Sequence, residues 1–206
     1  MALTAIVSYD GTDSDRDALA LGRLLARAGA SLELVYVRHA PDDLKDAPAT
    51  DDGMPLHVVL SGSTPDGLRA FALENGAELV VFGSEYRTAP GHVVPQASAR
   101  RLIDGGPVAV ALAPAGLHER DEVPVATIGA VGEDGDPCVA ETAGTLAAAL
   151  GAEVAPRATA GADLLVVGSK PGTVTGRVTI SAAAEYLIEL ARCPVIVLPR
   201  GVALAP

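Results

Sequence analysis

The sequence contains no tryptophan and few other aromatic residues. Aromatic side chains make up 3% of its 206 residues, whereas hydrophobic residues of all types make up 49%. The core therefore has to be packed mainly from Val, Leu, Ile and Ala, a composition typical of parallel strands that are buried on both faces. This shortage of aromatic residues favours an α/β protein with a parallel sheet.

Cysteine and clustered basic residues are also scarce. Cys138 and Cys193 are far apart in the chain, in no metal-ligand or redox spacing, and a disulfide scaffold would carry more cysteines in a shorter chain. The net charge is −11, and of the 15 Lys and Arg residues only Arg100 and Arg101 are adjacent. Because phosphate neutralisation needs a concentrated basic stripe, we expect no nucleic-acid partner.

Long apolar runs are missing as well. The longest runs have about the length of a strand, which is too short to cross a membrane. Met1–Leu3 leads directly into a predicted strand, without the basic region and apolar stretch of a signal peptide. We therefore expect a cytoplasmic protein with no membrane partner and with reduced cysteines.

Apolar runs alternate with amphipathic segments from Thr4 to Leu112. The apolar runs predict five strands, at Thr4–Ser8, Leu32–Val37, Leu56–Leu60, Leu79–Phe82 and Val108–Leu112. Helices are predicted between them, two ending at Gly29 and Gly76 and a third covering Ser98–Ile103. A polar stretch at 38–55 has no period and predicts a loop. Strands that alternate with helices form a parallel sheet with right-handed crossovers.

After a short charged segment the same pattern returns. We interpret residues 115–123 as a linker between a first module, 1–114, and a second module, 124–200. The second module begins with a predicted strand at Ala126–Val131 and a predicted helix at Asp136–Gly151. The chain is therefore predicted to hold two related parallel-sheet modules.

The repeat is shorter in the second module. Ala162–Ser169 matches Ala77–Ser84, and Gly151 matches Gly29, but the two matches have different offsets along the chain. The offset is smaller for the later match, which predicts the loss of about one strand and one helix from the middle of the second module. Only Glu153–Thr159 is left there as a possible short strand.

Polar residues follow the first strand, at the edge where ligands of an open parallel sheet bind. Ser8, Tyr9 and Asp10 lie at this strand end. The carboxylate of Asp10 can accept hydrogen bonds from a ribose hydroxyl or an adenine amine. It can equally cap the following helix, although Asp13 or Ser14 could do so instead.

A glycine-bearing loop follows the fourth strand, from Gly83 to the start of the next helix near Ser98. Free N–H groups and the positive end of a helix dipole suit a phosphate there, but a loop of this kind is also compatible with a plain turn. Arg87 in this loop, and Lys170 and Arg177 in the matching loop of the second module, either contact phosphates or are ordinary loop charges.

Taken together, these features resemble the universal stress protein family. The resemblance rests on six segments, Asp10, Leu79–Ser84, Ala99–Leu102, Pro107–Val110, Gly176–Val178 and Arg192–Val197. The chain is thus similar to a tandem universal stress protein, which implies two doubly wound open modules of the adenine nucleotide alpha hydrolase-like fold. The resemblance also implies a pseudo-twofold relation between the modules and pairing of their last strands, Val108–Leu112 with Val195–Leu198.

The resemblance further implies a site for ATP or AMP, with Mg²⁺ only in the case of ATP. In the family this site combines the acid after the first strand, the end of the second strand and a Gly-x-x-Gly, nine residues, Gly-Ser/Thr loop. Carried over residue by residue, the implied nucleotide site consists of Ser8, Tyr9, Asp10, Gly11, Val37, Gly83, Ser84, Arg87, Gly91, Gln96, Ala97 and Ser98.

The chain departs from the family pattern in both modules. Tyr86 stands where the loop has its second glycine, and Gln96 and Ala97 stand at its third glycine and hydroxyl. The side chain of Gln96 would crowd a phosphate. In the second module Gly132 matches Asp10, so we expect a structural role there and no independent nucleotide site.

Three functional hypotheses remain open. The first is a stress or regulatory protein in which adenine nucleotide orders the loop 83–98 and changes a surface offered to an unknown protein partner. The second is a nucleotide-free interaction scaffold. The third, a weak ATPase, lacks an evident general base, because Glu85 is the only carboxylate in the loop; we therefore expect no enzyme.

Metal sites are not predicted either. The four histidines have no metal-ligand spacing. The acidic stretch 42–52 is interpreted as a solvated loop, with calcium binding as the alternative.

Overall fold

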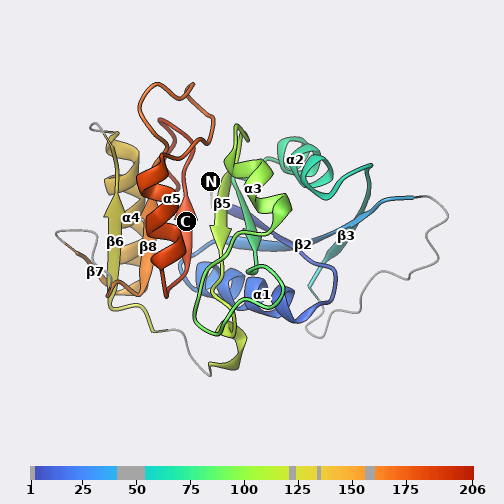
Figure 1. Cartoon of the computed structure of the whole chain (residues 1–206), viewed down its shortest axis with the longest axis horizontal. Coiled ribbons are helices and arrows are strands. Elements are labelled where there is room, and N and C mark those ends of the chain that lie inside the picture. Colours follow the sequence, from blue (N-terminus) through green and yellow to red (C-terminus); the bar gives the residue numbers. More distant parts are fainter. Residues whose placement is uncertain (1–2, 41–53, 121–123, 134–135, 156–160) are drawn as a thin grey trace.

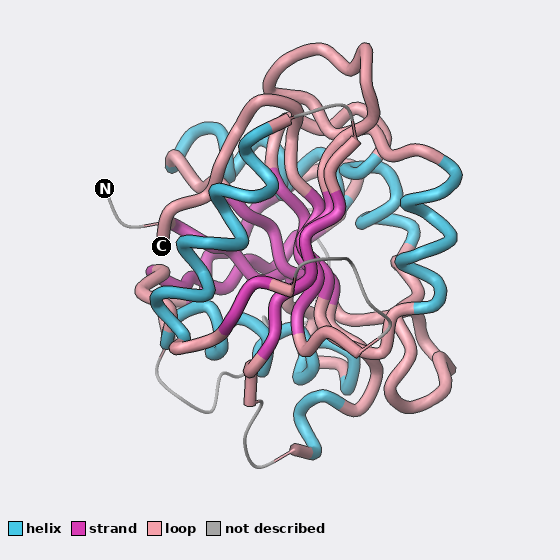
Figure 2. The backbone as a smooth tube through the Cα atoms, turned by 90° about the vertical axis from the view of Figure 1, so that its left-hand side faces the viewer, coloured by secondary structure: helices cyan, strands magenta, loops and turns pink. Residues whose placement is uncertain are grey.

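The computed structural model describes residues 3–40, 54–120, 124–133, 136–155 and 161–206. These residues form one sheet of nine strands with helices on both faces (Figure 1 and Figure 2). The order across the sheet is β3-β2-β1-β4-β5-β9-β8-β6-β7. The strands are β1 (Thr4–Ser8), β2 (Ser31–Arg38), β3 (Leu56–Leu60), β4 (Leu79–Phe82), β5 (Ala109–Leu112), β6 (Thr127–Val131), β7 (Glu153–Val154), β8 (Leu164–Val167) and β9 (Val195–Val197).

The five strands predicted for the first module are all present, and β1, β3 and β4 have the predicted bounds. No helix in the described part of the chain is long and apolar enough to cross a membrane. The loop predicted at 38–55 and the acidic stretch 42–52 fall largely on residues outside the described ones. The helices are α1 (Asp13–Arg27), α2 (Thr64–Asn75), α3 (Ala97–Ile103), the 3₁₀ turn η1 (Leu117–Glu119), α4 (Pro137–Leu150) and α5 (Ala182–Leu190).

The two faces of the sheet bury different helices. Val7 and Val81 belong to the cluster that holds the buried residues of α1, η1 and α4. Their strand neighbours Ile6 and Val80 belong to the opposite cluster, with α2, α3 and α5. All four side chains are fully buried. Strands covered on both faces explain why the core can be built almost entirely from aliphatic residues.

β5 and β9 form the antiparallel pair in an otherwise parallel sheet. The ladder is centred on Ala111, which pairs with Ile196, and these two residues are equivalent positions of the sequence repeat that matches Ser84 to Ser169. A register in which equivalent residues pair is the one that a twofold axis produces. The implied pairing of the last strands is therefore present, and it joins an N-terminal half (β1–β5) to a C-terminal half (β6–β9).

The C-terminal half has fewer elements than the N-terminal half. The segment 39–78 separates β2 from β4 and holds β3 and α2, whereas only 155–163 separates β7 from β8. That shorter segment is too short for a strand and a crossover helix. The short strand predicted at Glu153–Thr159 is present as β7, and residues 156–160 lie outside the described ones.

The segment interpreted as a linker is partly packed against the N-terminal half. Leu117 in η1 is fully buried. The buried carboxylate of Asp17 in α1 accepts the N–H groups of Gly116 and His118, each at 2.9 Å, and lies 2.6 Å from His118 Nδ1. The apolar residues of this charged segment follow no period, so the sequence pattern could not show this contact.

Both cysteines are free. Burial raises the pKa of the Cys193 thiol to about 11. The Cys193 side chain is therefore a neutral thiol at physiological pH.

We expect Asp17→Ala to destabilise the protein by about 3 kcal/mol, because the N–H groups of Gly116 and His118 lose a buried, charged acceptor. For a chain of this size that loss lowers the melting temperature by roughly 6–12 °C. Thermal unfolding of Asp17→Ala beside Asp13→Ala, an exposed carboxyl on the same helix, measures it. Equal melting temperatures for the two variants would contradict the role of Asp17.

Candidate functional site

The predicted nucleotide site lies at the carboxyl ends of β1 and β4. The chain runs from β1 outward through β2 and β3 on one side, then returns to β4 and β5 on the other. The order of strands thus reverses between β1 and β4, and open α/β sheets bind ligands at such a point. Asp10 follows β1 and is exposed, and Gly83 follows β4. The structure therefore places these two predicted residues on either side of the reversal.

The turn after β1 is held by a carboxylate that was not predicted from the sequence. Asp15 is buried, and its Oδ2 accepts the N–H of Asp10 at 2.9 Å, the N–H of Thr12 at 2.9 Å and the hydroxyl of Thr12 at 2.7 Å. Thr12 is the N-cap of α1 and forms a capping box with Asp15. The expectation that Asp10, Asp13 or Ser14 caps this helix is therefore wrong. The Thr12-x-x-Asp15 spacing was the signal that could have predicted it.

Gly83 brings the end of β4 into contact with the first turn of α1. A Cβ added at Gly83 would lie 1.8 Å from the carbonyl oxygen of Ser14. Only glycine allows this approach without moving one of the two backbones. Gly83 thus has a structural role that is independent of any ligand.

Gln96 fills the gap between these same elements. It is the N-cap of α3. Its Nε2 donates to Ser14 Oγ at 3.4 Å and to the carbonyl oxygen of Ser84 at 3.3 Å. The side chain that was expected to crowd a phosphate therefore bridges the start of α1 and the end of β4. Ala97 and Ser98 form the first turn of α3 behind it.

The remaining predicted residues lie in three different surroundings. Ser8, Tyr9 and Val37 are buried, and Val37 packs against α2 at Gly67. Gly11 is exposed in the turn after β1. Arg87 lies in the loop after β4, exposed, with its guanidinium 5.3 Å from the ring centre of Tyr86.

Ser84 anchors the loop after β4. Its buried hydroxyl donates to the carbonyl oxygen of Ala113 at 2.7 Å, and it accepts the N–H of Val94 at 3.3 Å. Gly91, in the same loop, donates its N–H to the carbonyl oxygen of Ala115 at 2.7 Å. Ser84 and Gly91 therefore hold the loop to the end of β5.

The same contacts recur at the equivalent positions of the C-terminal half. The buried hydroxyl of Ser169 donates to the carbonyl oxygen of Leu198 at 2.7 Å and accepts the N–H of Thr179 at 3.1 Å. Gly176 donates to the carbonyl oxygen of Arg200 at 2.8 Å. Each donor and acceptor matches its partner in the N-terminal half position by position.

The strand end of the C-terminal half is closed by charged residues. The hydroxyl of Ser181, at the position of Gln96, donates to the carboxylate of Glu133. Arg200 donates to the carbonyl oxygen of Glu133 at 3.4 Å and lies 3.7 Å from the carboxylate of Asp136. Both strand ends are thus bridged by the protein's own side chains, although by different ones.

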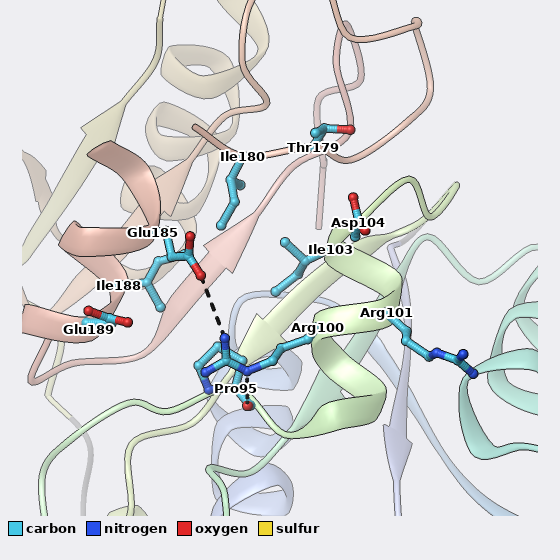
Figure 3. A pocket seen from close by; sticks show the side chains of 10 residues that line it. All are labelled: Pro95, Arg100, Arg101, Ile103, Asp104, Thr179, Ile180, Glu185, Ile188 and Glu189. Carbon is cyan, nitrogen blue, oxygen red and sulfur yellow. Dashed lines mark hydrogen bonds and ion pairs between the residues drawn. The ribbon is translucent and has the colours of Figure 1, made fainter. Parts of the chain in front are cut away.

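A separate cleft of about 370 Å³ lies between α3 and α5, at the junction of the halves (Figure 3). Arg100 and Glu185 face each other across it at 3.7 Å. These two residues are equivalent positions of the repeat, as are Ile103 and Ile188. None of the predicted nucleotide-binding residues lines this cleft, so it arises from the meeting of the two halves and is distinct from the strand-end site.

No protein-family model matches the sequence, and no curated protein is significantly similar to it. Solved structures do share its fold. A protein assigned to the universal stress proteins, from Pseudomonas aeruginosa UCBPP-PA14, has a TM-score of 0.67 at 13% identity, covering 97% of this chain and 94% of its own. A protein of unknown function from Pseudomonas aeruginosa PAO1 has a TM-score of 0.65 at 14% identity, covering 97% and 93%.

A universal stress protein from Archaeoglobus fulgidus DSM 4304 has a TM-score of 0.62 at 10% identity, covering 96% of this chain and 98% of its own. At these identities the likeness establishes the fold. The chain has the fold of universal stress proteins, an open and mostly parallel α/β sheet, as the resemblance implied.

Gly83→Ala and Gly168→Ala form a matched pair that tests the close approach at β4. The added Cβ meets backbone in Gly83→Ala, whereas in Gly168→Ala its nearest neighbour is the side-chain atom Val139 Cγ2 at 2.6 Å, which can move. We expect a loss of about 3 kcal/mol for Gly83→Ala and about 1 kcal/mol for Gly168→Ala. Urea unfolding measures both, and the reverse order of stabilities would refute this account.

The carboxyl group of Asp136 makes the stability of the fold depend on pH in the acid range. Burial raises the pKa of its carboxyl, but the N–H groups of Gly201 and Cys138 and the charge of Arg200 outweigh this effect, so the pKa lies below its ordinary value of 3.8. A lowered pKa stabilises the fold above the unfolded value, and this contribution is lost as the pH falls through the folded value.

Asp136→Asn keeps a side chain able to cap α4 but removes the charge. We expect it to be about 1–2 kcal/mol less stable than the wild type at pH 7, with the difference shrinking below about pH 4. Thermal melts from pH 7 to pH 2.5 measure this difference, with Asp13→Asn as the exposed control. A difference that does not depend on pH would show that the charge has no part in it.

Proposed function

We propose that this chain is a regulatory protein of universal stress protein type whose first module binds an adenine nucleotide, ATP or AMP, at the carboxyl edge of β1 and β4. The observation that carries the proposal is the placement of Asp10 and Gly83 on either side of the point where the strand order reverses. The proposed modules are residues 1–114 and 124–200. The loop contacts that recur at equivalent positions, through Ser84 and Ser169, support this division.

The residues at this edge suit the adenosine part of a nucleotide. Asp10 is exposed, and its carboxylate is an acceptor suited to ribose hydroxyls or an adenine amine. Its backbone N–H is bonded to Asp15, so the turn that carries it is held in place before a ligand arrives. In our proposal Asp10 and Gly11 hold the adenosine, beside the buried end of β2 at Val37.

The phosphate part has to displace Gln96. The two hydrogen bonds of its Nε2, at 3.3 and 3.4 Å, are longer than usual for N–H···O contacts. Each of them therefore costs little to break. When Gln96 leaves Ser14 and Ser84, the first turn of α3 at Ala97 and Ser98 becomes available to a phosphate, with Mg²⁺ in the case of ATP.

Displacement of Gln96 gives the site a regulatory consequence. Gln96 links α1 to the base of the loop that carries Tyr86, which is 78% exposed, and Arg87. A nucleotide that breaks this link changes the support of an exposed aromatic surface. We propose that this surface is the one offered to a protein partner.

A nucleotide-free scaffold is the second candidate function. It is favoured by the same bridge, because Gln96 already occupies the space that a phosphate needs. Tyr186 and Leu190 on α5, exposed by 61% and 55%, add an apolar surface on which a partner could dock. An ATPase is less well supported, because Glu85, the carboxylate of the loop, is exposed on the loop surface.

Calorimetric titration of the full chain with ATP and AMP decides between these candidates. We expect Asp10→Ala to weaken nucleotide binding at least about tenfold, because the ribose or adenine loses a charged acceptor. We expect Gln96→Gly to strengthen it, because the phosphate no longer displaces a side chain. Asp13→Ala, an exposed carboxyl in the same turn, is the control and should bind as the wild type does.

Two other outcomes of the titration would contradict parts of this proposal. If Asp10→Ala binds nucleotide as tightly as the wild type, the site assignment is wrong. If only Gln96→Gly binds, the natural protein is the scaffold, and its fold retains a site that Gln96 keeps closed.

A further inference from the structure

The loop after β8 borders a second cleft, which carries two cations. The cleft has a volume of about 420 Å³ and lies between this loop and the turn that precedes β5. Figure 1 shows the long loop between β8 and α5 rising beside that turn. Its lining residues are Gly105, Lys170, Pro171, Gly172, Thr173, Val174, Arg177 and Thr179.

Hydrogen bonds from the N-terminal half fix this loop. Val178 donates its N–H to the carbonyl oxygen of Gly106 at 2.8 Å and accepts the N–H of Gly105 at 2.6 Å. The guanidinium of Arg177 donates to the carbonyl oxygen of Gly105 at 3.2 Å. The cleft is therefore built from both halves, and its walls are held by backbone contacts.

The charge of the cleft is opposite to that of the chain. Lys170 and Arg177 are exposed, and none of the residues that line the cleft is acidic. The chain as a whole carries a net charge of −11. Two cations that face one cavity without a carboxylate among its lining residues favour an anionic ligand. The guanidinium and the ammonium group are the side chains best suited to an oxyanion.

Thr173 supplies a hydroxyl group beside these cations. Its Oγ1 is buried and makes no hydrogen bond within the described part of the chain. The equivalent hydroxyl in the N-terminal half, on Thr88, donates to the carbonyl oxygen of Glu85. The backbone turns are the same, since Thr88 and Thr173 donate their N–H groups to Glu85 and Lys170. The Thr173 hydroxyl thus lacks the bond that its equivalent makes, and an anion in the cleft can accept from it once the side chain turns towards the cleft.

The pair of cations is present in the C-terminal loop and absent at the matching positions of the N-terminal loop. In the repeat that matches Ser84 to Ser169, Lys170 is matched by Glu85 and Arg177 by His92. At these two positions the first loop thus has a carboxylate and a histidine, and its Arg87 is matched by Gly172, whereas the second loop has two cations. The N-terminal loop is therefore an internal control for the C-terminal one.

We propose that Lys170, Arg177 and Thr173 form a binding site for a soluble phosphate group, either inorganic phosphate or a phosphomonoester. The site does not depend on the proposed nucleotide site, because it shares no residue with it and includes Gly105 of the opposite half. A phosphate bound there contacts the loop that Gly105 and Gly106 hold, and so links the two halves of the molecule.

Titration of the full chain with inorganic phosphate at low ionic strength tests the site, by calorimetry and by the shift in melting temperature. We expect saturable binding with one phosphate per chain, weakened at least about tenfold in Lys170→Glu and in Arg177→Ala. Thr173→Val should lose affinity by a smaller factor. Arg69→Ala, which removes an exposed arginine on α2, should bind as the wild type does.

Glycerol 3-phosphate is the second probe and should compete with inorganic phosphate. Asp10→Ala should bind phosphate normally, and Lys170→Glu should bind ATP normally if the nucleotide site is real, so the two proposals fail separately. The phosphate proposal is overturned if the wild type shows no saturable binding, or if Lys170→Glu and Arg177→Ala bind phosphate as it does while remaining folded by circular dichroism.

Discussion

The rest of the structure depends on the antiparallel ladder between β5 and β9. Every residue of β5 and of β9 is fully buried, so either strand alone would leave an apolar sheet edge open to aggregation. Their pairing removes both edges. It also sets the positions of the two loops that carry the candidate chemistry, because Ser84 is bonded to Ala113 just beyond β5 and Ser169 to Leu198 just beyond β9.

The buried residues Ser84 and Ser169 make the same contacts in the two halves, whereas the other side chains of their loops differ. Both hydroxyls bond a carbonyl oxygen beyond the last strand at 2.7 Å, and both accept an N–H from the far end of their loop. The backbone of each loop is thereby fixed by a contact that uses no charged group. Side chains that project from this frame can change without cost to it. Arg87 is an exception, because its backbone is left-handed, with a φ of 69°, and a residue with a side chain is strained there. The matching Gly172 adopts the same conformation without a steric penalty.

The sequence predicted the elements of the sheet well, because each strand is a short apolar run bounded by turn residues. The ends of β1, β3 and β4 agree with their patterns. Contacts between residues that are distant in the sequence could not be predicted in the same way. Asp17 accepts hydrogen bonds from Gly116 and His118, which are about 100 residues away in the sequence. No local spacing in the sequence indicates this contact.

In the candidate site, too, local features could be predicted from the sequence and tertiary contacts could not. The identity of Gln96 predicted a conflict with phosphate, but its partners Ser14 and Ser84 follow from how α1, β4 and α3 meet. Asp15 was a different kind of omission. Its capping-box spacing with Thr12 is local, so the sequence alone contains the signal for the turn that holds Asp10.

The two strand ends differ in how firmly they are closed. At β4 the bridge is the neutral amide of Gln96, with two long hydrogen bonds. At β8 the bridge joins the Ser181 hydroxyl to the carboxylate of Glu133, and Arg200 lies between Glu133 and the buried side chain of Asp136. Hydrogen bonds to charged groups are roughly twice as strong as neutral ones, and opening this second bridge removes the Ser181 hydroxyl from the partly buried carboxylate of Glu133. The bridge at the first strand end therefore costs less to open than the bridge at the second. The cleft proposed to bind phosphate does not require this second bridge to open, because Ser181, Glu133 and Arg200 are not among the residues that line it.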